Sequence, residues 1–134
     1  MSDNSYKVTV ITIDEQYHSV FGEDYFPKDR RGGMLLSQRI DALNFRLRES
    51  EPGYVSDWHV AGDPTMIVVQ QGIIRITLQN GEFRDFAAGD TFIARDFLPK
   101  DIAFDKLVHG HQAQVIGIET FKAAHIKLQS LVSS

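Results

Sequence analysis

The stretch of sequence that decides the fold is residues 53–72, Gly-Tyr-Val-Ser-Asp-Trp-His-Val-Ala-Gly-Asp-Pro-Thr-Met-Ile-Val-Val-Gln-Gln-Gly. Two extended runs are separated by the turn Gly62-Asp-Pro64, and a glycine stands at each end. The second run, residues 65–71, is rich in apolar and β-branched residues, which favours a buried strand. His59 ends the first run. We therefore expect two successive strands, with an ionisable side chain at the end of the first.

Short runs of strand-forming residues continue on both sides of this stretch. Asn80-Gly81 is the strongest hairpin signal in the chain. In the run 42–48, Phe45 and Leu47 share one face of the predicted strand, and Arg46 and Arg48 share the other. The predicted strands are 7–13, 35–40, 42–48, 54–59, 65–71, 73–79, 82–86, 91–96 and 112–121.

The other segments carry weaker patterns. Residues 14–34 are predicted to be irregular and 97–107 to form a long loop, and the tail 122–134 has a weak helical pattern. Many short strands with glycine and asparagine turns and almost no helix predict an all-β sandwich or barrel, of which a jelly roll is one form.

The size and composition indicate one folded, soluble domain. A chain of 134 residues is long enough to bury one core. We expect a single domain over 1–134, with a core of about 35–121, an N-terminal segment 1–34 and a tail 122–134. The absence of cysteine excludes disulfides, thiolate metal sites and a cysteine nucleophile. With neither a signal sequence nor an apolar run long enough to span a membrane, the expected location is cytoplasmic.

The charge distribution argues against nucleic acid as a partner. The net charge is −4, and the one dense basic cluster, Lys28-Asp-Arg-Arg31, is interrupted by an acidic residue. Nucleic-acid binding requires lysine and arginine gathered on one face to neutralise phosphates. We expect neither a nucleic acid nor a membrane as a partner.

The spacing within 53–72 resembles the first sequence motif of the cupins, which reads Gly, five residues, His-x-His, three or four residues, Glu, six residues, Gly. Gly53, His59 and Gly72 fall in register with it, whereas Ala61 replaces the second histidine and Thr65 the glutamate. The hairpin 79–82 and the turn 86–90 follow in the family's order, so the resemblance covers about 54–119. It implies a small single-domain bacterial cupin with degenerate metal-binding motifs, folded as a double-stranded β-helix (a jelly-roll β-barrel).

A narrower resemblance is to a subgroup of small bacterial cupins. It is carried by Asp57-Trp-His59, Arg95-Asp96 and Gly110-His111, together with His18-Ser-Val-Phe21 near the N-terminus. The second cupin motif has collapsed, because non-ligating residues occupy its histidine and asparagine positions, Lys100 and Phe104. The resemblance therefore implies a pocket and not a reaction.

The resemblance also defines the candidate metal ligands. Cupin metals are held by two or three histidines and a carboxylate, a donor set that suits Fe, Mn, Ni or Zn. With most of these positions lost, we expect no metal cofactor. The alternative is a rearranged site, formed either by His59, His111 and one carboxylate (Asp57, Asp96 or Glu119) or by the set His59, His109 and His111.

The candidate ligand-binding residues are His59, Gln71, Asp96 and His111, and the candidate catalytic residues are His59, Asp96 and Glu119. Counting along the strand places Gln71 in the pocket with Thr65, Ile67 and Val69, although a position at the edge near the turn fits it equally. Each candidate also has a purely structural interpretation. His59 fits a hydrogen-bonded, partly buried histidine, and Asp96 fits a surface ion pair with Arg95, worth less than about 1 kcal/mol. His18 and His125 are predicted to lie on the surface.

Three functions follow from these observations, and whether the chain is an enzyme stays open. The first is a metal-free cupin that binds a small organic molecule in an apolar pocket. The second is an isomerase or dioxygenase type of enzyme, using either the rearranged metal site or His59 as a general base. The third is a structural module. The family resemblance also implies a homodimer, paired through an edge strand or a sheet face, with residues 7–13 as a shared element.

Overall fold

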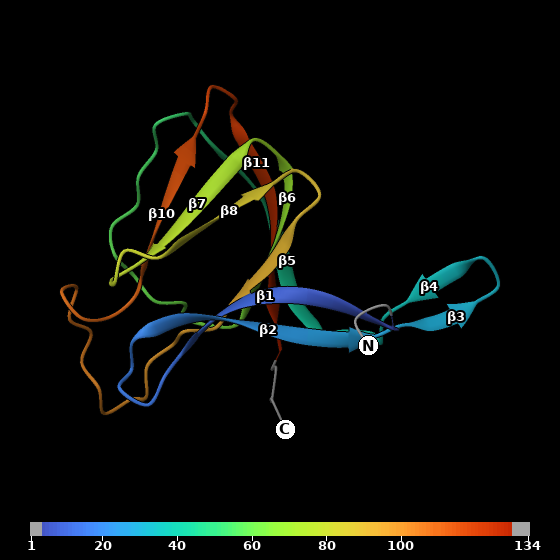
Figure 1. Ribbon diagram of the computed structural model, residues 1–134, viewed down its shortest axis with the longest axis horizontal. Coiled ribbons are helices and arrows are strands. Elements are labelled where there is room, and N and C mark those ends of the chain that lie inside the picture. Colours follow the sequence, from blue (N-terminus) through green and yellow to red (C-terminus); the bar gives the residue numbers. More distant parts are fainter. Residues whose placement is uncertain (1–3, 130–134) are drawn as a thin grey trace.

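A computed structural model gives the structure of the protein and describes residues 4–129. The regular elements of this part of the chain are β-strands, joined by loops and turns (Figure 1). Within it, no helix is long and apolar enough to cross a membrane. The strands are β1 (Ser5–Ile13), β2 (Ser19–Pro27), β3 (Asp29–Arg31), β4 (Met34–Leu36), β5 (Ala42–Ser50), β6 (Thr65–Gln71), β7 (Ile73–Leu78), β8 (Phe83–Ala87), β9 (Thr91–Ala94), β10 (His111–Ile116) and β11 (Phe121–Leu128).

Two sheets face each other and enclose the core. The large sheet has the order β2-β1-β9-β6-β11-β5, and the small sheet has the order β10-β7-β8. The segment 53–59 runs antiparallel beside β10, joined to it by the bridges Val55–Gln114 and His59–His111. It thus serves as a fourth strand of the small sheet. Four strands of the large sheet, β5-β11-β6-β9, then oppose four of the small one.

This eight-strand arrangement is a double-sheet jelly roll, the architecture to which cupins belong. The predicted all-β, jelly-roll fold class is confirmed. β1 and β2 extend the large sheet beyond the eight strands, since β1 pairs in parallel with β9 and antiparallel with β2.

Alternation along the strands supplies the core. β7 shows the period of two most clearly, because Ile74, Ile76 and Leu78 are buried while the residues between them are half-buried. Facing residues of the large sheet, such as Val69 and Phe92, complete the apolar layer between the sheets. A second, smaller cluster around Val10, Ile93 and Leu128 covers the outer face of the large sheet.

Four sequence predictions about secondary structure were wrong. The segment predicted as irregular, 14–34, contains β2, which is paired along its whole length with β1. The predicted strand 35–40 is only the end of the short β4. The predicted long strand 112–121 is interrupted by a turn after Ile116, and the tail predicted as weakly helical begins with β11, a central strand of the large sheet. Residues 130–134 of that tail lie outside the described residues.

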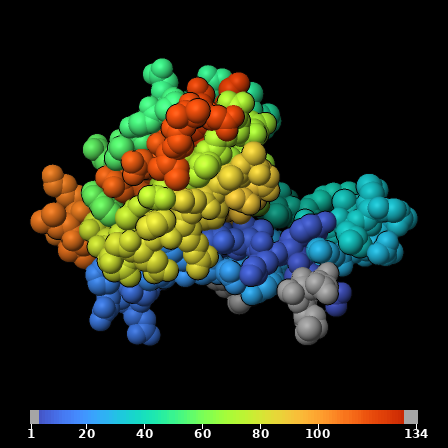
Figure 2. All heavy atoms as spheres, turned by 45° about the horizontal axis from the view of Figure 1, so that its top comes forward, coloured from blue at the N-terminus to red at the C-terminus, as the bar shows by residue number. Residues whose placement is uncertain are grey.

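The hairpin β3–β4 projects from the body of the molecule (Figures 1 and 2). All six of its strand residues are exposed, including Met34, Leu35 and Leu36. The loop 97–110 lies at the opposite end of the molecule (Figure 2).

Candidate functional site

A cavity of about 240 Å³ lies between the two sheets. Its floor is apolar and is formed by Ile67, Ile74, Ile76, Phe92 and Phe121. Its ionisable side chains are an arginine and three histidines, and they come from both sheets: Arg48, His59, His111 and His125. An apolar enclosure with a few converging polar groups is the usual construction of a small-molecule site.

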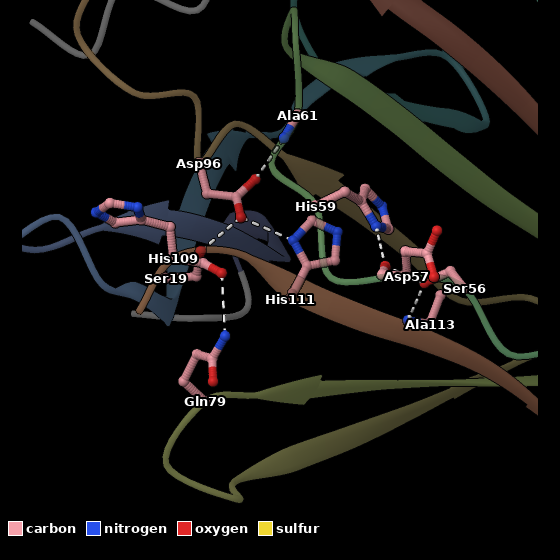
Figure 3. Close-up of polar contacts among 10 residues, drawn as sticks. All are labelled: Ser19, Ser56, Asp57, His59, Ala61, Gln79, Asp96, His109, His111 and Ala113. Atoms are coloured by element: carbon pink, nitrogen blue, oxygen red, sulfur yellow. Dashed lines mark hydrogen bonds and ion pairs between the residues drawn. The ribbon is translucent and has the colours of Figure 1, made fainter. Parts of the chain in front are cut away.

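Asp96 is the centre of a buried polar network beside this cavity (Figure 3). Its side chain is fully buried, at 0% exposure. The Ser19 hydroxyl donates to Oδ2 at 2.6 Å, and the Ala61 amide donates to Oδ1 at 2.9 Å. His111 Nδ1 lies 2.7 Å from Oδ2. The carboxylate is therefore held from three sides by segments distant in sequence.

The electrostatics of this network favour an ionised carboxylate. Burial alone raises the pKa of the Asp96 carboxyl, but the hydrogen bonds and charge of His111 and the hydrogen bonds from Ser19 and Ala61 outweigh burial. The net pKa is below the ordinary value of 3.8. An anionic carboxylate accepts the proton on His111 Nδ1, which leaves Nε2 as the ring nitrogen outside this hydrogen bond.

His59 and His111 stand side by side. The isolated bridge places them opposite each other, and their ring centroids are 4.5 Å apart. His59 Nδ1 lies 2.8 Å from the carbonyl oxygen of Asp57, which accepts its proton and leaves Nε2 free. Although His59 is exposed at the cavity, desolvation of its ring is the main cause that lowers its pKa below 6.5. The charges of His111 and Arg48 lower this pKa further. His59 is thus neutral at neutral pH.

Gly110 permits this close approach. It has a φ of +90°, and a Cβ at this position would lie 2.5 Å from the carbonyl oxygen of His59. Only glycine combines that backbone angle with that contact at low cost. The Gly110-His111 pair thus allows the segment carrying His59 to lie against β10.

The large sheet contributes Arg48 and His125 to the cavity. They lie on adjacent strands, β5 and β11, and Arg48 Nη1 approaches His125 Nε2 at 3.3 Å. Desolvation, followed by the charges of Arg48 and Arg46, lowers the pKa of His125 to about 4. His125 is therefore neutral at pH 7 and accepts a hydrogen bond from Arg48. The prediction that His125 is a surface residue was wrong.

The structure brings together three of the predicted site residues, His59, Asp96 and His111. It moves two others away. Gln71 ends β6 beyond the cavity floor, and its amide donates to the carbonyl of Thr120 at 3.0 Å in the turn between β10 and β11. Glu119 is exposed in that same turn, because β10 ends before it. Neither residue lines the cavity.

His109 has a structural role in the loop 97–110. It is buried, and its Nδ1 accepts a hydrogen bond from the Asp105 amide at 2.9 Å. Gln79 then binds the loop to the β7–β8 hairpin, donating to the carbonyl of Lys106 at 2.8 Å. It also donates to the carbonyl of His109 at 3.1 Å (Figure 3). His109 thus points away from the pair of His59 and His111.

The donor set does not fit the predicted rearranged metal site. No group of three or more His, Asp, Glu or Cys side chains suited to a metal ion occurs in residues 4–129. The carboxylate of Asp96 is already engaged by three partners, and Asp57 is exposed and meets His59 through its backbone carbonyl. His59 and His111 are left as two adjacent imidazoles.

Three residues of the site were missed or misplaced by sequence reasoning. Ser19 lay within His18-Ser-Val-Phe21, noted for its resemblance and not for a contact with Asp96. Arg48 was visible as a polar residue of an alternating run, and His125 lay in the tail predicted as weakly helical, but the orientation of both toward a cavity was not visible. The surface ion pair considered for Asp96 is absent, because Arg95 pairs with Asp24, Nη2 to Oδ1, at 3.0 Å.

Comparison with known proteins found no matching family model and no matching curated protein. Solved structures do match. A conserved protein of unknown function from Streptococcus pyogenes is 20% identical, with 72% of each chain covered and a TM-score of 0.46. A cupin-2 domain containing protein from Shewanella frigidimarina is 17% identical over 69% of this chain and 81% of that one, with a TM-score of 0.44. The cupin domain of Schizosaccharomyces pombe Cnp3 is 12% identical over 92% of this chain and 88% of that one, with a TM-score of 0.45.

Proposed function

We propose that this chain is a metal-free, cupin-type domain that binds a small organic molecule in the cavity between its sheets. The observation that carries the proposal is the cavity itself, with an apolar floor and ionisable groups confined to one arginine and three histidines. A volume of about 240 Å³ equals roughly eight water molecules at ~30 Å³ each. The ligand is therefore small, on the order of ten non-hydrogen atoms.

A fragment screen by NMR tests this proposal. Fragments of that size are expected to shift the methyl resonances of Ile67, Ile74 and Ile76. Ala113→Leu fills the cavity from β10 and should abolish these shifts. Ala124→Leu, on β11 but outside the cavity lining, is the matched control and should retain them. Shifts that persist in Ala113→Leu would place binding elsewhere and refute the proposal.

Elemental analysis separately tests the proposal that the domain holds no metal. Protein purified without a histidine tag or chelator is expected to carry Fe, Mn, Ni and Zn far below one equivalent. Near-stoichiometric metal that is lost in both His59→Ala and His111→Ala would overturn that proposal.

A second candidate function, metal-free acid–base catalysis of an isomerase type, is favoured by the pair Asp96–His111. An imidazole oriented by a buried carboxylate, with Nε2 available to a ligand, is suited to proton abstraction. Deuterium incorporation into a bound fragment in D₂O, lost in His111→Gln, would support catalysis. Binding without exchange would leave a binding domain.

A further inference from the structure

Arg48 places a permanent positive charge at the cavity. Its strand neighbour across the large sheet is Ala123, and the side chain is half-buried. The guanidinium lies 5.4 Å from the ring centroid of Tyr54 and 5.2 Å from that of Phe121. Its Nε donates to the Ser50 hydroxyl at 3.0 Å, and Nη1 meets His125. Every one of these partners is neutral at pH 7.

No carboxylate of the described residues forms an ion pair with Arg48, although ion pairs occur elsewhere in the chain. Desolvation accordingly lowers the pKa of its guanidinium, with only a small opposing contribution from Tyr54. A buried charge is normally paired, because removing an ion from water is costly. The guanidinium also has five N–H donors, more than its neighbours use.

Asp96, the carboxylate bound to His111, does not neutralise the charge of Arg48. Asp96 is bound to His111, Ser19 and Ala61, and it is not part of the cavity lining. The lining itself contains no Asp or Glu. The cavity is therefore a small apolar enclosure with one unpaired cation.

We propose that the ligand of this cavity is a small organic carboxylate, bound through its carboxylate to Arg48 and through its apolar part to the floor. This inference rests on the proposed function and specifies the ligand class. Arginine presents a planar fork that matches a carboxylate, and such charge-assisted hydrogen bonds are roughly twice as strong as neutral ones. Removal of water from the cavity strengthens the attraction further.

The test compares each carboxylate with its neutral amide of nearly equal shape. The probes are isobutyrate with isobutyramide and benzoate with benzamide, titrated at constant ionic strength and followed by the cavity resonances. The variants are Arg48→Gln, Arg48→Lys and, as matched control, Arg46→Gln, an exposed arginine two residues away on the same strand. Thermal unfolding of each variant checks that it is folded.

The wild-type protein is expected to bind each carboxylate at least about tenfold more tightly than its amide. Arg48→Gln should remove this preference and leave amide binding within about twofold. Arg48→Lys should retain part of the preference for the carboxylate, because lysine keeps the positive charge but lacks the planar fork of the guanidinium. Arg46→Gln should change neither affinity by more than about twofold.

Two results would overturn the inference and leave the proposed function standing. These are equal affinities of acid and amide in the wild-type protein, and an unchanged carboxylate affinity in Arg48→Gln. Absence of any shift with all four probes overturns the inference as well. In that case the wider fragment screen with Ala113→Leu decides separately whether the cavity binds organic molecules at all.

Discussion

At the scale of single residues, the site depends on one buried carboxylate. Asp96 is excluded from solvent, and three donors from separate segments compensate for its desolvation. Both oxygens of the Asp96 carboxylate accept hydrogen bonds from these donors, so the carboxylate has little freedom to exchange them for other partners. The carboxylate fixes the tautomer and the orientation of His111, and through the bridge between His111 and His59 it positions the second imidazole as well.

Asp96→Asn is expected to reduce the free energy of unfolding at pH 7 on the order of 3 kcal/mol, because it replaces a buried carboxylate that accepts three hydrogen bonds. The pKa of Asp96 is lower in the folded than in the unfolded state. The ionised carboxylate therefore contributes its full stability above the unfolded pKa of about 3.9, and loses it as the pH falls through the lower folded pKa. Wild type and variant should converge in that acid range.

Urea unfolding between pH 2 and pH 8 measures this difference. The matched control is Asp85→Asn, which breaks the exposed ion pair with Arg75 and should reduce the stability far less than Asp96→Asn does. A difference between wild type and Asp96→Asn that stays constant down to pH 2 would contradict the assigned ionisation.

At the scale of elements, the site forms where the segment 53–59 meets β10. Two sheet-like bridges, Val55–Gln114 and His59–His111, hold this segment at the edge of the small sheet. The His59 and His111 backbones exchange both hydrogen bonds, at 3.0 and 2.9 Å. The contact depends on the absence of a side chain at Gly110, so a backbone feature positions the two histidines.

Gly110→Ala is expected to destabilise the fold more than Gly89→Ala does. Both glycines have similar positive φ angles, +90° and +94°, but a Cβ at Gly89 meets no atom within 4 Å. Gly89→Ala thus reports backbone strain alone, about 1–2 kcal/mol. Gly110→Ala adds the clash with His59 and should shift the imidazole resonances of His59 and His111. Equal losses of stability with unchanged imidazole resonances would show that the close approach is not required.

At the scale of the whole molecule, one face of the large sheet carries exposed apolar side chains. Leu43, Phe45 and Leu47 alternate along β5 and are 58%, 67% and 72% exposed. β5 is also one of the two edge strands of this sheet in the described residues. β1, considered from the sequence as an element shared in a dimer, is paired on both edges within its own chain. The homodimer stays a prediction, and we propose β5 as its site.

Phe45→Lys is expected to shift a dimer to monomer in a concentration series by light scattering, because a charge on this apolar face opposes its burial. Ile118→Lys is the matched control. Ile118 is 94% exposed in the turn after β10 and is not part of β5, and its substitution should leave the dimer intact. A wild-type protein that is monomeric at all concentrations, or a Phe45→Lys protein that remains dimeric, would refute the proposed interface.

The sequence by itself determined the fold class and the strands of its central part. The run 65–71 was predicted with the bounds of β6, because an apolar β-branched run closed by glycine is a strong local signal. β11 was missed for a physical reason. It is a central strand, so its apolar residues do not alternate cleanly, and alanine and lysine in it favour a helical interpretation. β2 is an edge strand with Gly22 inside it and mixed burial on both faces, so its local signal was weak.

Only the tertiary structure decided which residues meet. Asp96 lies 77 residues from Ser19, 35 from Ala61 and 15 from His111, and no local pattern records such separations. Alternation along 42–48 separated Phe45 and Leu47 from Arg46 and Arg48, but it could not say which face points inward. The usual rule would bury the apolar face, whereas this fold turns Arg48 toward the cavity and leaves Phe45 and Leu47 exposed. Sheet register and the closing of one sheet on the other fix these choices, because the side-chain period of two leaves both faces open until a strand is paired.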